Sequence, residues 1–170
     1  MCTLSFIPHT NGYAVGMNRD ELRSRPRALA PRYFECNGVT ALYPSETLGV
    51  TWIAVNVYGQ LFALLNWYSA YARTLKAKPR SRGEIIPQMI FDSEFRAAAA
   101  ILASPRLAGI LPFRLIGIDP KHRVIGEWRW DGRRIRRSTF PWTRKHWFPP
   151  ACPTLKPKNI GVLLALWRRP

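Results

Sequence analysis

The sequence predicts an α+β fold in which antiparallel sheets pack against a few short helices. Strand-like apolar runs flank tight turn signals, of which Asn11-Gly12 and Asp131-Gly132 are the strongest. Helix-start signals occur in the middle of the chain, between residues 81 and 104. The order is therefore strands, helices and strands, which favours sheets with helices packed outside them.

The N-terminal part of the chain is expected to be β structure. The first two strands form a hairpin around Asn11-Gly12, and a second hairpin has Tyr58-Gly59 at its turn. The two strands of the second hairpin are continuously apolar, as expected for strands that are buried on both faces. In order, the expected strands are residues 3–7, 13–17, 39–43, 49–57 and 61–65.

Short helices and further strands follow. Residues 73–82 are basic and polar, which indicates a loop, and Ser81 and Glu84 then fit the N-cap and N3 positions of a capping box. Pro87 should keep this helix short or kinked, and Asp92-Ser93 can cap a second helix. The later elements expected are strands at 113–119, 124–130 and 134–139, an irregular Pro-rich segment at 141–157, and a short helix or strand at 160–167.

Length and composition limit the choice of function. A chain of 170 residues is expected to form one domain, residues 1–170, and 47% apolar residues exclude a disordered chain. The net charge of +16 predicts attraction to nucleic acid, anionic membranes or acidic small molecules. Near the C-terminus the apolar run at 162–167 is too short for a membrane span, and no signal peptide is visible, so a cytoplasmic location is expected. Three widely spaced cysteines predict neither a metal site nor a cofactor.

The first hairpin brings a thiol close to charged groups. A two-residue turn at Asn11-Gly12 sets Cys2 opposite Glu21, and a turn one residue earlier sets it opposite Arg19. Directly opposed residues share a face, so either register favours Arg19 and Glu21 on the side of Cys2. A bulge would exchange them for Asn18 and Asp20. The sequence leaves the register open.

Cys2 also occupies a position that suits nucleophilic catalysis. Removal of Met1, which is usual before a small residue, would leave Cys2 with a free α-amine beside its thiol. An α-amine has a pKa of roughly 7.7–8.0, which suits a general base near neutral pH. Such an amine can activate an N-terminal nucleophile, while Arg19 would favour the thiolate and Asp20 or Glu21 would orient the amine.

Five short motifs occur in order along the first ninety residues: Met1-Cys2-Thr3, Asn18-Arg19-Asp20-Glu21, Gly49-Val50-Thr51-Trp52, Leu65-Asn66-Trp67 and Ser81-Arg82-Gly83-Glu84. Together they resemble the NRDE family, also called the transport and Golgi organization 2 family. Residues 113–148 are similar more loosely. The motif of four residues is weak by itself, whereas five motifs in order are specific.

The resemblance implies an N-terminal-nucleophile hydrolase-like fold: a four-layer αββα sandwich of two antiparallel sheets flanked by helices, here shortened at the C-terminus. Related enzymes with an N-terminal Cys, such as penicillin V acylases and bile salt hydrolases, cleave amide bonds. By this resemblance Cys2 is the nucleophile, Arg19 with Asp20 or Glu21 completes its surroundings, and Asn66 helps to hold the oxyanion. The same motifs supply the expected binding residues Asn18, Trp52 and Trp67.

Three functions therefore compete. The first is hydrolysis of a linear or cyclic amide in a small, anionic substrate. The second is a non-catalytic carrier or chaperone for haem or another acidic ligand, since haem trafficking has been proposed for eukaryotic members of the family. The third is polyanion binding through residues 121–147, where nine Lys or Arg are interleaved with four Trp. A sheet with one buried Trp face and one solvated Arg face also explains that pattern and is favoured over nucleic-acid binding.

Overall fold

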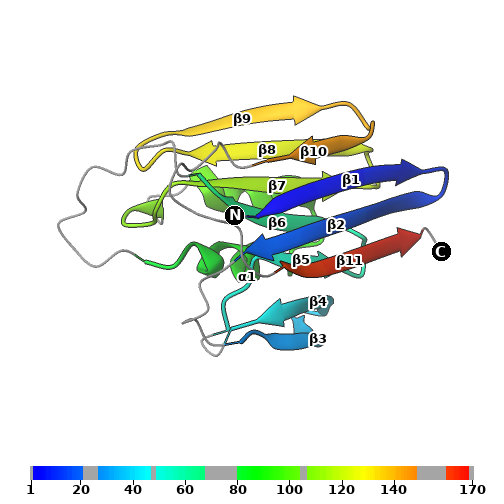
Figure 1. The fold of residues 1–170 in the computed structure, drawn as a ribbon, viewed down its shortest axis with the longest axis horizontal. Helices are drawn as coiled ribbons and strands as arrows, with labels where there is room; N and C mark the ends of the chain where they lie inside the picture. The colour runs from blue at the N-terminus through cyan, green and yellow to red at the C-terminus, as the bar shows by residue number, and fades with distance from the viewer. Residues whose placement is uncertain are drawn as a thin grey trace.

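The computed structural model describes residues 2–20, 27–46, 49–67, 80–103, 107–148 and 160–168. These residues form two antiparallel sheets (Figure 1). The larger has seven strands in the order β3-β4-β5-β6-β7-β8-β9, and the smaller has four in the order β10-β1-β2-β11. The strands are β1 Thr3–His9, β2 Gly12–Asp20, β3 Leu29–Cys36, β4 Val39–Ser45, β5 Ile53–Asn56, β6 Leu61–Asn66, β7 Phe113–Asp119, β8 Val124–Trp130, β9 Ile135–Phe140, β10 Lys145–Trp147 and β11 Ile160–Arg168.

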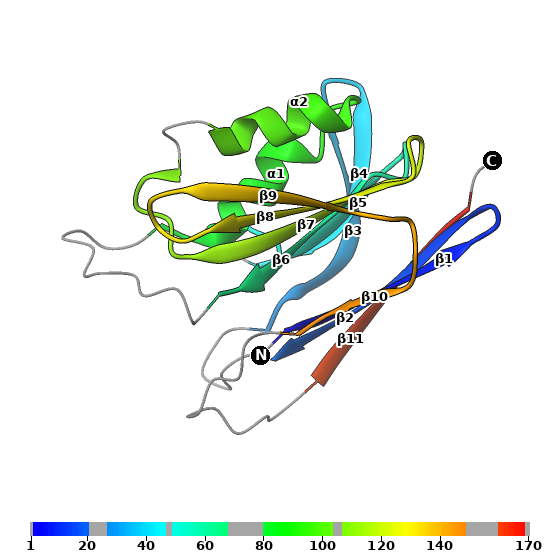
Figure 2. The same cartoon turned by 90° about the horizontal axis from the view of Figure 1, so that it is seen from above.

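The helices are short and lie together on one side of the larger sheet (Figure 2). Pro87 lies inside the first α-helix, which spans only five residues, as the sequence predicted. Buried side chains of both α-helices pack against the outer face of the sheet. The helical elements are η1 Arg82–Glu84, α1 Ile85–Met89, α2 Phe95–Ala100 and η2 Ile101–Ala103.

Strand β6 is buried on both faces and holds the layers together. Leu61 and Leu65 belong to the cluster between the two sheets, whereas Phe62 and Leu64 belong to the cluster under the helices. This confirms the expectation drawn from the continuous apolar run. Each fully buried side chain of this size stabilises the fold by about 1.5–3 kcal/mol, so β6 is a rigid base for whatever its last residue does.

The described residues form three layers, α, β and β, rather than the four that the resemblance implies. The described helical segments all lie between β6 and β7, and those with buried side chains, α1, α2 and η2, pack on the same face of the larger sheet. Within the described residues, no helix covers the outer face of the smaller sheet (Figure 2). The α+β class with antiparallel sheets is confirmed.

Two strands, β3 and β10, were not predicted from the sequence, and the C-terminal element, expected as either a helix or a strand, is a strand. β3 was not expected, because its residues are nearly all exposed and show no alternation. β10 lies within the segment expected to be irregular, and it is a strand because it pairs with β1, Leu4 opposite Trp147. Residues 160–168 form a strand, paired along its whole length with β2.

The register of the first hairpin is also decided. Thr3 pairs with Asn18 and His9 pairs with Gly12, so the turn is centred one residue before Asn11-Gly12. Continuing this register by one residue sets Cys2 opposite Arg19. The hairpin therefore brings these two residues to the same end of the smaller sheet.

Candidate active site

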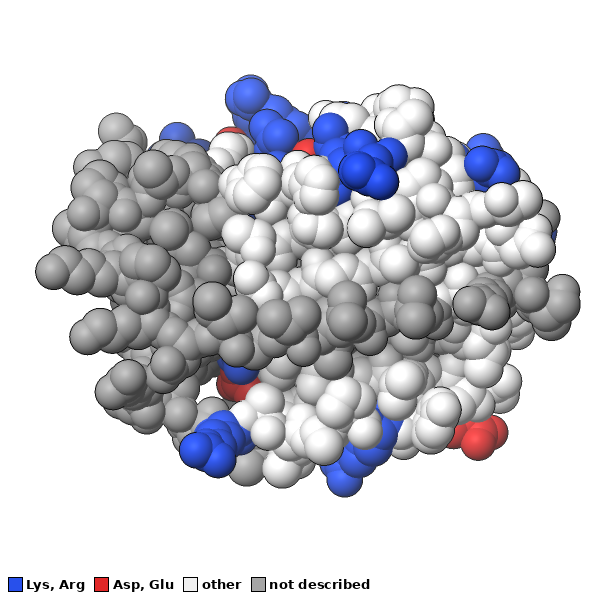
Figure 3. All heavy atoms as spheres, turned by 45° about the vertical axis from the view of Figure 1, so that its right-hand side comes forward, with Lys and Arg blue, Asp and Glu red and all other residues white. Residues whose placement is uncertain are grey.

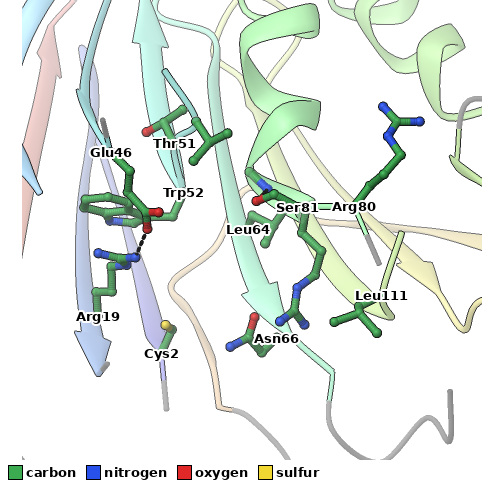
Figure 4. Close-up of a pocket in the computed structure, with 13 residues that line it drawn as sticks. Cys2, Arg19, Glu46, Thr51, Trp52, Leu64, Asn66, Arg80, Ser81 and Leu111 are labelled. Carbon is green, nitrogen blue, oxygen red and sulfur yellow. Dashed lines mark hydrogen bonds and ion pairs between the residues drawn. The ribbon is translucent and has the colours of Figure 1, made fainter. Parts of the chain in front are cut away.

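A cavity of about 270 Å³ opens where β1 begins and β6 ends (Figure 4). It lies between the two sheets, with η1 on its far wall. Its described lining comes from seven separate stretches of chain: Cys2, Arg19, Glu46, the run Val50-Thr51-Trp52, Leu64 with Asn66, the segment Arg80-Ser81-Arg82-Gly83, and Leu111.

Cys2 stands at the start of the smaller sheet, directly before β1. Its side chain is 6% exposed and belongs to the cluster between the sheets, with Leu4 and Phe6 of the same strand fully buried behind it. The remaining exposure is at the cavity, which Cys2 lines. The thiol is thus a core side chain with one open side, an arrangement that limits approach to one direction.

Arg19 is held from two sides. Its guanidinium forms an ion pair with Glu46, which directly follows β4, and the Arg19 Cζ lies 3.9 Å from the centre of the Trp52 ring. Figure 4 shows the ion pair beside the Trp52 ring. An ion pair and a cation–π contact together fix a long, flexible side chain in one orientation. The wall beside Cys2 therefore carries a fixed positive charge.

Asn66 reaches the same cavity from the other sheet. It is the last residue of β6, where it pairs with Phe113 of β7, and the buried Leu65 precedes it. Its side chain extends toward the side on which Cys2 stands (Figure 4). The amide group of Asn can donate a hydrogen bond to an oxygen atom of a ligand.

The far wall depends on a close approach between two loops. The Thr51 N–H donates to the Gly83 carbonyl at 3.2 Å, and a Cβ added to Gly83 would lie 2.9 Å from the Val50 Cβ. Only Gly therefore fits here without movement. Ser81 caps η1 by accepting from the Gly83 N–H at 3.3 Å, as expected for the N-cap.

Two arginines lie on this wall. Arg82 donates to the Pro112 carbonyl at 2.9 Å, and Arg80 forms an ion pair with Glu84 at 2.7 Å. The Glu84 of the expected capping box is thus engaged with Arg80. Three arginines and one glutamate occur among the described lining residues, which favours an anionic ligand.

The structure brings together four of the residues singled out from the sequence: Cys2, Arg19, Trp52 and Asn66 all line the cavity. Asn18 lies in the middle of the smaller sheet, between Thr3 and Val162, and neither it nor Trp67 lines the cavity. Asp20 ends β2 opposite Ile160, and its side chain lies outside the description. Glu21 lies outside the described residues.

Sequence reasoning missed three charged residues of the cavity. Glu46 contacts Arg19 from a loop 27 residues away, a contact for which no local signal exists. Arg82 belongs to a motif that had been interpreted as a helix cap, and Arg80 to the expected basic loop. The positive charge of residues 73–82 was visible in the sequence. Nothing in the sequence indicated that Arg80 and Arg82 would line a cavity.

The described residues contain no group of three or more His, Cys, Asp or Glu side chains arranged to hold a metal ion. They also include no helix whose length and apolar character would allow it to cross a membrane.

Comparison with known families decides the affiliation of the chain. The model of the family TANGO2, Transport and Golgi organisation 2, matches residues 1–128. The chain belongs to this family. No curated protein sequence matches it. All described lining residues of the cavity lie within the part that matches the TANGO2 model, whereas β9, β10 and β11 follow it.

Proposed function

We propose that this TANGO2-family protein hydrolyses an amide bond, with Cys2 as the nucleophile. The observation that carries the proposal is the convergence of Cys2 and Arg19 from one sheet with Asn66 from the other on a single cavity. Cys2 and Asn66 are 64 residues apart and belong to different sheets, so the hairpin alone does not explain their meeting. Two facing antiparallel sheets with a thiol at the first strand are also what an N-terminal-nucleophile hydrolase requires.

The reaction would proceed through a thioester. The Cys2 sulfur attacks the amide carbon, and the Cys2 α-amine accepts the thiol proton. The C–N bond then breaks, the amine product leaves with that proton, and the acyl group remains on sulfur. Water attacks the thioester with the α-amine as base, which releases the carboxylic acid and restores the thiol. This route requires a mature chain that begins at Cys2.

Asn66 and Arg19 would have different tasks. The Asn66 side-chain amide would donate to the oxyanion of the tetrahedral intermediate, where one donor contributes about 3 kcal/mol. The fixed guanidinium of Arg19 would stabilise the Cys2 thiolate relative to the thiol, and Glu46 would moderate that effect through its ion pair. Trp52 would keep Arg19 oriented.

The lining favours a small, negatively charged substrate. Three arginines against one glutamate attract an anionic group, and a carboxylate matches the fork of a guanidinium. A cavity of about 270 Å³ is slightly smaller than the 300–1,000 Å³ of sites for drug-sized ligands. The same volume counts against haem as the ligand of this cavity, because haem is a large, flat ligand. An N-acylated amino acid fits both size and charge.

The decisive experiment combines mass and turnover. Intact mass of the protein purified from cells should lack Met1. The purified protein should then release free amine from a panel of N-acetyl and N-butyryl amino acids, detected with an amine-reactive dye, and prefer them over the corresponding methyl esters. Cys2→Ser should abolish release, whereas Cys36→Ser, at an exposed cysteine, should leave it unchanged.

Three results would contradict the proposal. A mass that retains Met1 would remove the base, and turnover that persists in Cys2→Ala would remove the nucleophile. Absence of turnover on the panel, together with a shift of the haem absorption band on titration, would support the carrier instead. Asn66→Ala separates chemistry from binding, since it should lower kcat while KM changes little.

A further inference from the structure

Three arginines stand in register across β7, β8 and β9. Arg114 pairs with Arg129, and Arg129 pairs with Arg136. Residues that are directly opposed share one face, and neighbouring strands lie about 4.8 Å apart. We refer to Arg114, Arg129 and Arg136 as the arginine ladder. Like charges at such spacing destabilise a sheet unless an anion compensates them.

The compensation inside the protein is incomplete. Glu127 accepts from the Nε of Arg114 at 2.6 Å and from the Nε of Arg129 at 2.8 Å, and it is 1% exposed. Arg136 is exposed, and the carboxylate of Asp131 is an opposite charge that interacts with it at longer range. The ladder therefore holds one buried carboxylate and three guanidinium groups, of which those of Arg129 and Arg136 are accessible to solvent.

The edge strand β9 extends this positive surface. From residue 124 to residue 140 the hairpin carries five arginines and two acids, Glu127 and Asp131. Arg133, Arg134, Arg136 and Arg137 are all exposed. Because alternate residues of a strand point to opposite faces, β9 presents guanidinium groups on both sides of the sheet edge. Lys and Arg spheres gather along the upper border of Figure 3, the side on which β9 runs in Figure 1.

The tryptophans of this hairpin are not available to a ligand. Trp128 and Trp130 are buried under the helices, and the Trp130 Nε1 donates to the Ile110 carbonyl at 2.9 Å. Stacking of bases on these rings is therefore excluded. Within this hairpin the cations alone are available as recognition elements, whereas of the other two interleaved Trp, Trp147 is buried and Trp142 is half-buried.

We propose that the arginine ladder and the other exposed arginines of the β8–β9 hairpin, Arg133, Arg134 and Arg137, bind the phosphate backbone of single-stranded nucleic acid without reading its bases. A flexible strand can pass around the sheet edge and reach guanidinium groups on both faces, whereas a flat lipid surface reaches only one face. The net charge of +16 adds long-range attraction. None of the ladder residues is among the described lining residues of the Cys2 cavity, so binding to this surface should not depend on the thiol.

The test measures how affinity depends on salt. The probe is a fluorescein-labelled oligothymidylate of about 20 nucleotides, followed by anisotropy. Each lost phosphate contact lowers the slope of log K against log salt by about 0.7 for a single strand. Arg134→Gln with Arg136→Gln should therefore flatten the slope by about 1.4 and weaken binding about 25-fold at 0.1 M salt. These side chains are exposed, so the fold should persist in circular dichroism.

The control is a second pair of Arg→Gln substitutions, which removes the same two positive charges from exposed positions outside the β8–β9 hairpin. Arg32 and Arg96 are exposed, on β3 and α2, and Arg32→Gln with Arg96→Gln should change affinity less than twofold. Arg134→Lys with Arg136→Lys should restore most of the binding. Equal losses in the two Gln pairs would overturn the proposal, since net charge alone would then explain binding. Dependence on β9 arginines for phosphatidylserine vesicles, but not for the oligonucleotide, would overturn it in favour of a membrane surface.

Discussion

Arg19 forms an ion pair with Glu46 while its guanidinium lies against the ring of Trp52. The three residues come from β2, the end of β4 and the start of β5, so both sheets contribute to the position of one cation. The register of the first hairpin sets this cation opposite Cys2. Under the proposed function, Arg19 therefore favours the thiolate form of Cys2, whereas the negative charge of Glu46 opposes that effect.

Opposite substitutions at this pair should change thiol reactivity in opposite directions. Glu46→Gln removes the carboxylate that pairs with Arg19 and should speed alkylation of Cys2 by iodoacetamide at pH 6.5 about two- to fivefold. Arg19→Gln should slow it by a similar factor. Peptide mass spectrometry measures the alkylation of Cys2 and of the exposed Cys36 in the same sample, so Cys36 serves as the internal control. If both variants slow Cys2, the pair has a structural role only.

Gly83 offers a test in which two physical effects have opposite signs. Ala is a better helix residue than Gly by up to about 1 kcal/mol, so propensity predicts that Gly83→Ala stabilises η1. The added Cβ would lie 2.9 Å from the Val50 Cβ and 3.1 Å from the Thr51 carbonyl oxygen, so packing predicts the reverse. We expect packing to dominate, with a loss of about 1–3 kcal/mol in urea unfolding. Ser81→Ala is the comparison, since it removes only the cap. A stabilised Gly83→Ala would show that the two loops separate easily.

The parts of the fold that could be predicted are mostly those encoded by turn residues and by the apolar runs beside them. The hairpins around Asn11-Gly12 and Asp131-Gly132 follow from the turn residues and the flanking apolar runs. β3 gave no such signal in its own residues, although Asn37-Gly38 at its end is a turn pair. β10 is a strand because of a partner about 140 residues away, and no local pattern encodes that.

The site divides in the same way. The meeting of Cys2 and Arg19 follows from counting residues around a turn, and the sequence left only the register open. The arrival of Asn66 at the cavity could be expected from the family resemblance alone. Glu46 could not be expected, because an ion pair between a residue of β2 and a residue in the loop after β4 depends on how the sheets pack.

Glu127 should make stability depend on acidity. Hydrogen bonds from Arg129 and Arg114 hold the pKa of the buried Glu127 carboxyl below its usual value, despite the opposing effect of burial. The ionised form is favoured in the folded state, so its contribution is complete above the unfolded pKa of about 4.3 and is lost as pH falls through the lowered folded pKa. Glu127→Gln should cost about 3 kcal/mol in urea unfolding at pH 7, because the largely buried Arg114 and the half-exposed Arg129 lose the buried carboxylate that they share.

The difference between the parent protein and Glu127→Gln should shrink as the pH falls below about 4.3, because the unfolded parent then binds a proton at Glu127 that the folded parent does not yet bind. Glu94→Gln is the control, since Glu94 is exposed and its nearest ion-pair distance, to Lys121, is 4.0 Å. A difference that stays constant from pH 7 to pH 3 would mean that the shape of Glu127, rather than its charge, is what the arginines require.

Tyr13 should make the fold sensitive to alkali. Its ring is 1% exposed, and its hydroxyl donates to the Gly59 carbonyl at 2.7 Å. Burial raises the pKa of Tyr13 well above its usual value. The hydroxyl therefore stays neutral in the folded state, and its contribution is complete below the unfolded pKa of about 10. Above that pH the unfolded state ionises, and the free energy of unfolding falls by about 1.4 kcal/mol per pH unit.

Tyr13→Phe separates the hydrogen bond from the ionisation. At pH 8 the variant should be less stable by about 1–2 kcal/mol, because the buried Gly59 carbonyl loses its donor. At pH 11 the variant escapes the alkaline loss, so the difference should narrow by about 1.4 kcal/mol and can change sign. Tyr33→Phe is the control, since Tyr33 is 76% exposed and should show no difference at either pH. Urea midpoints at pH 8 and pH 11 measure this. Every other titrating group is common to the parent and the variant, so the change in their stability difference between pH 8 and pH 11 reports on Tyr13 alone. A stability difference that does not narrow would mean that Tyr13 ionises in the folded state. The packing of its ring against Trp142 and Trp167 would then have to open to admit water.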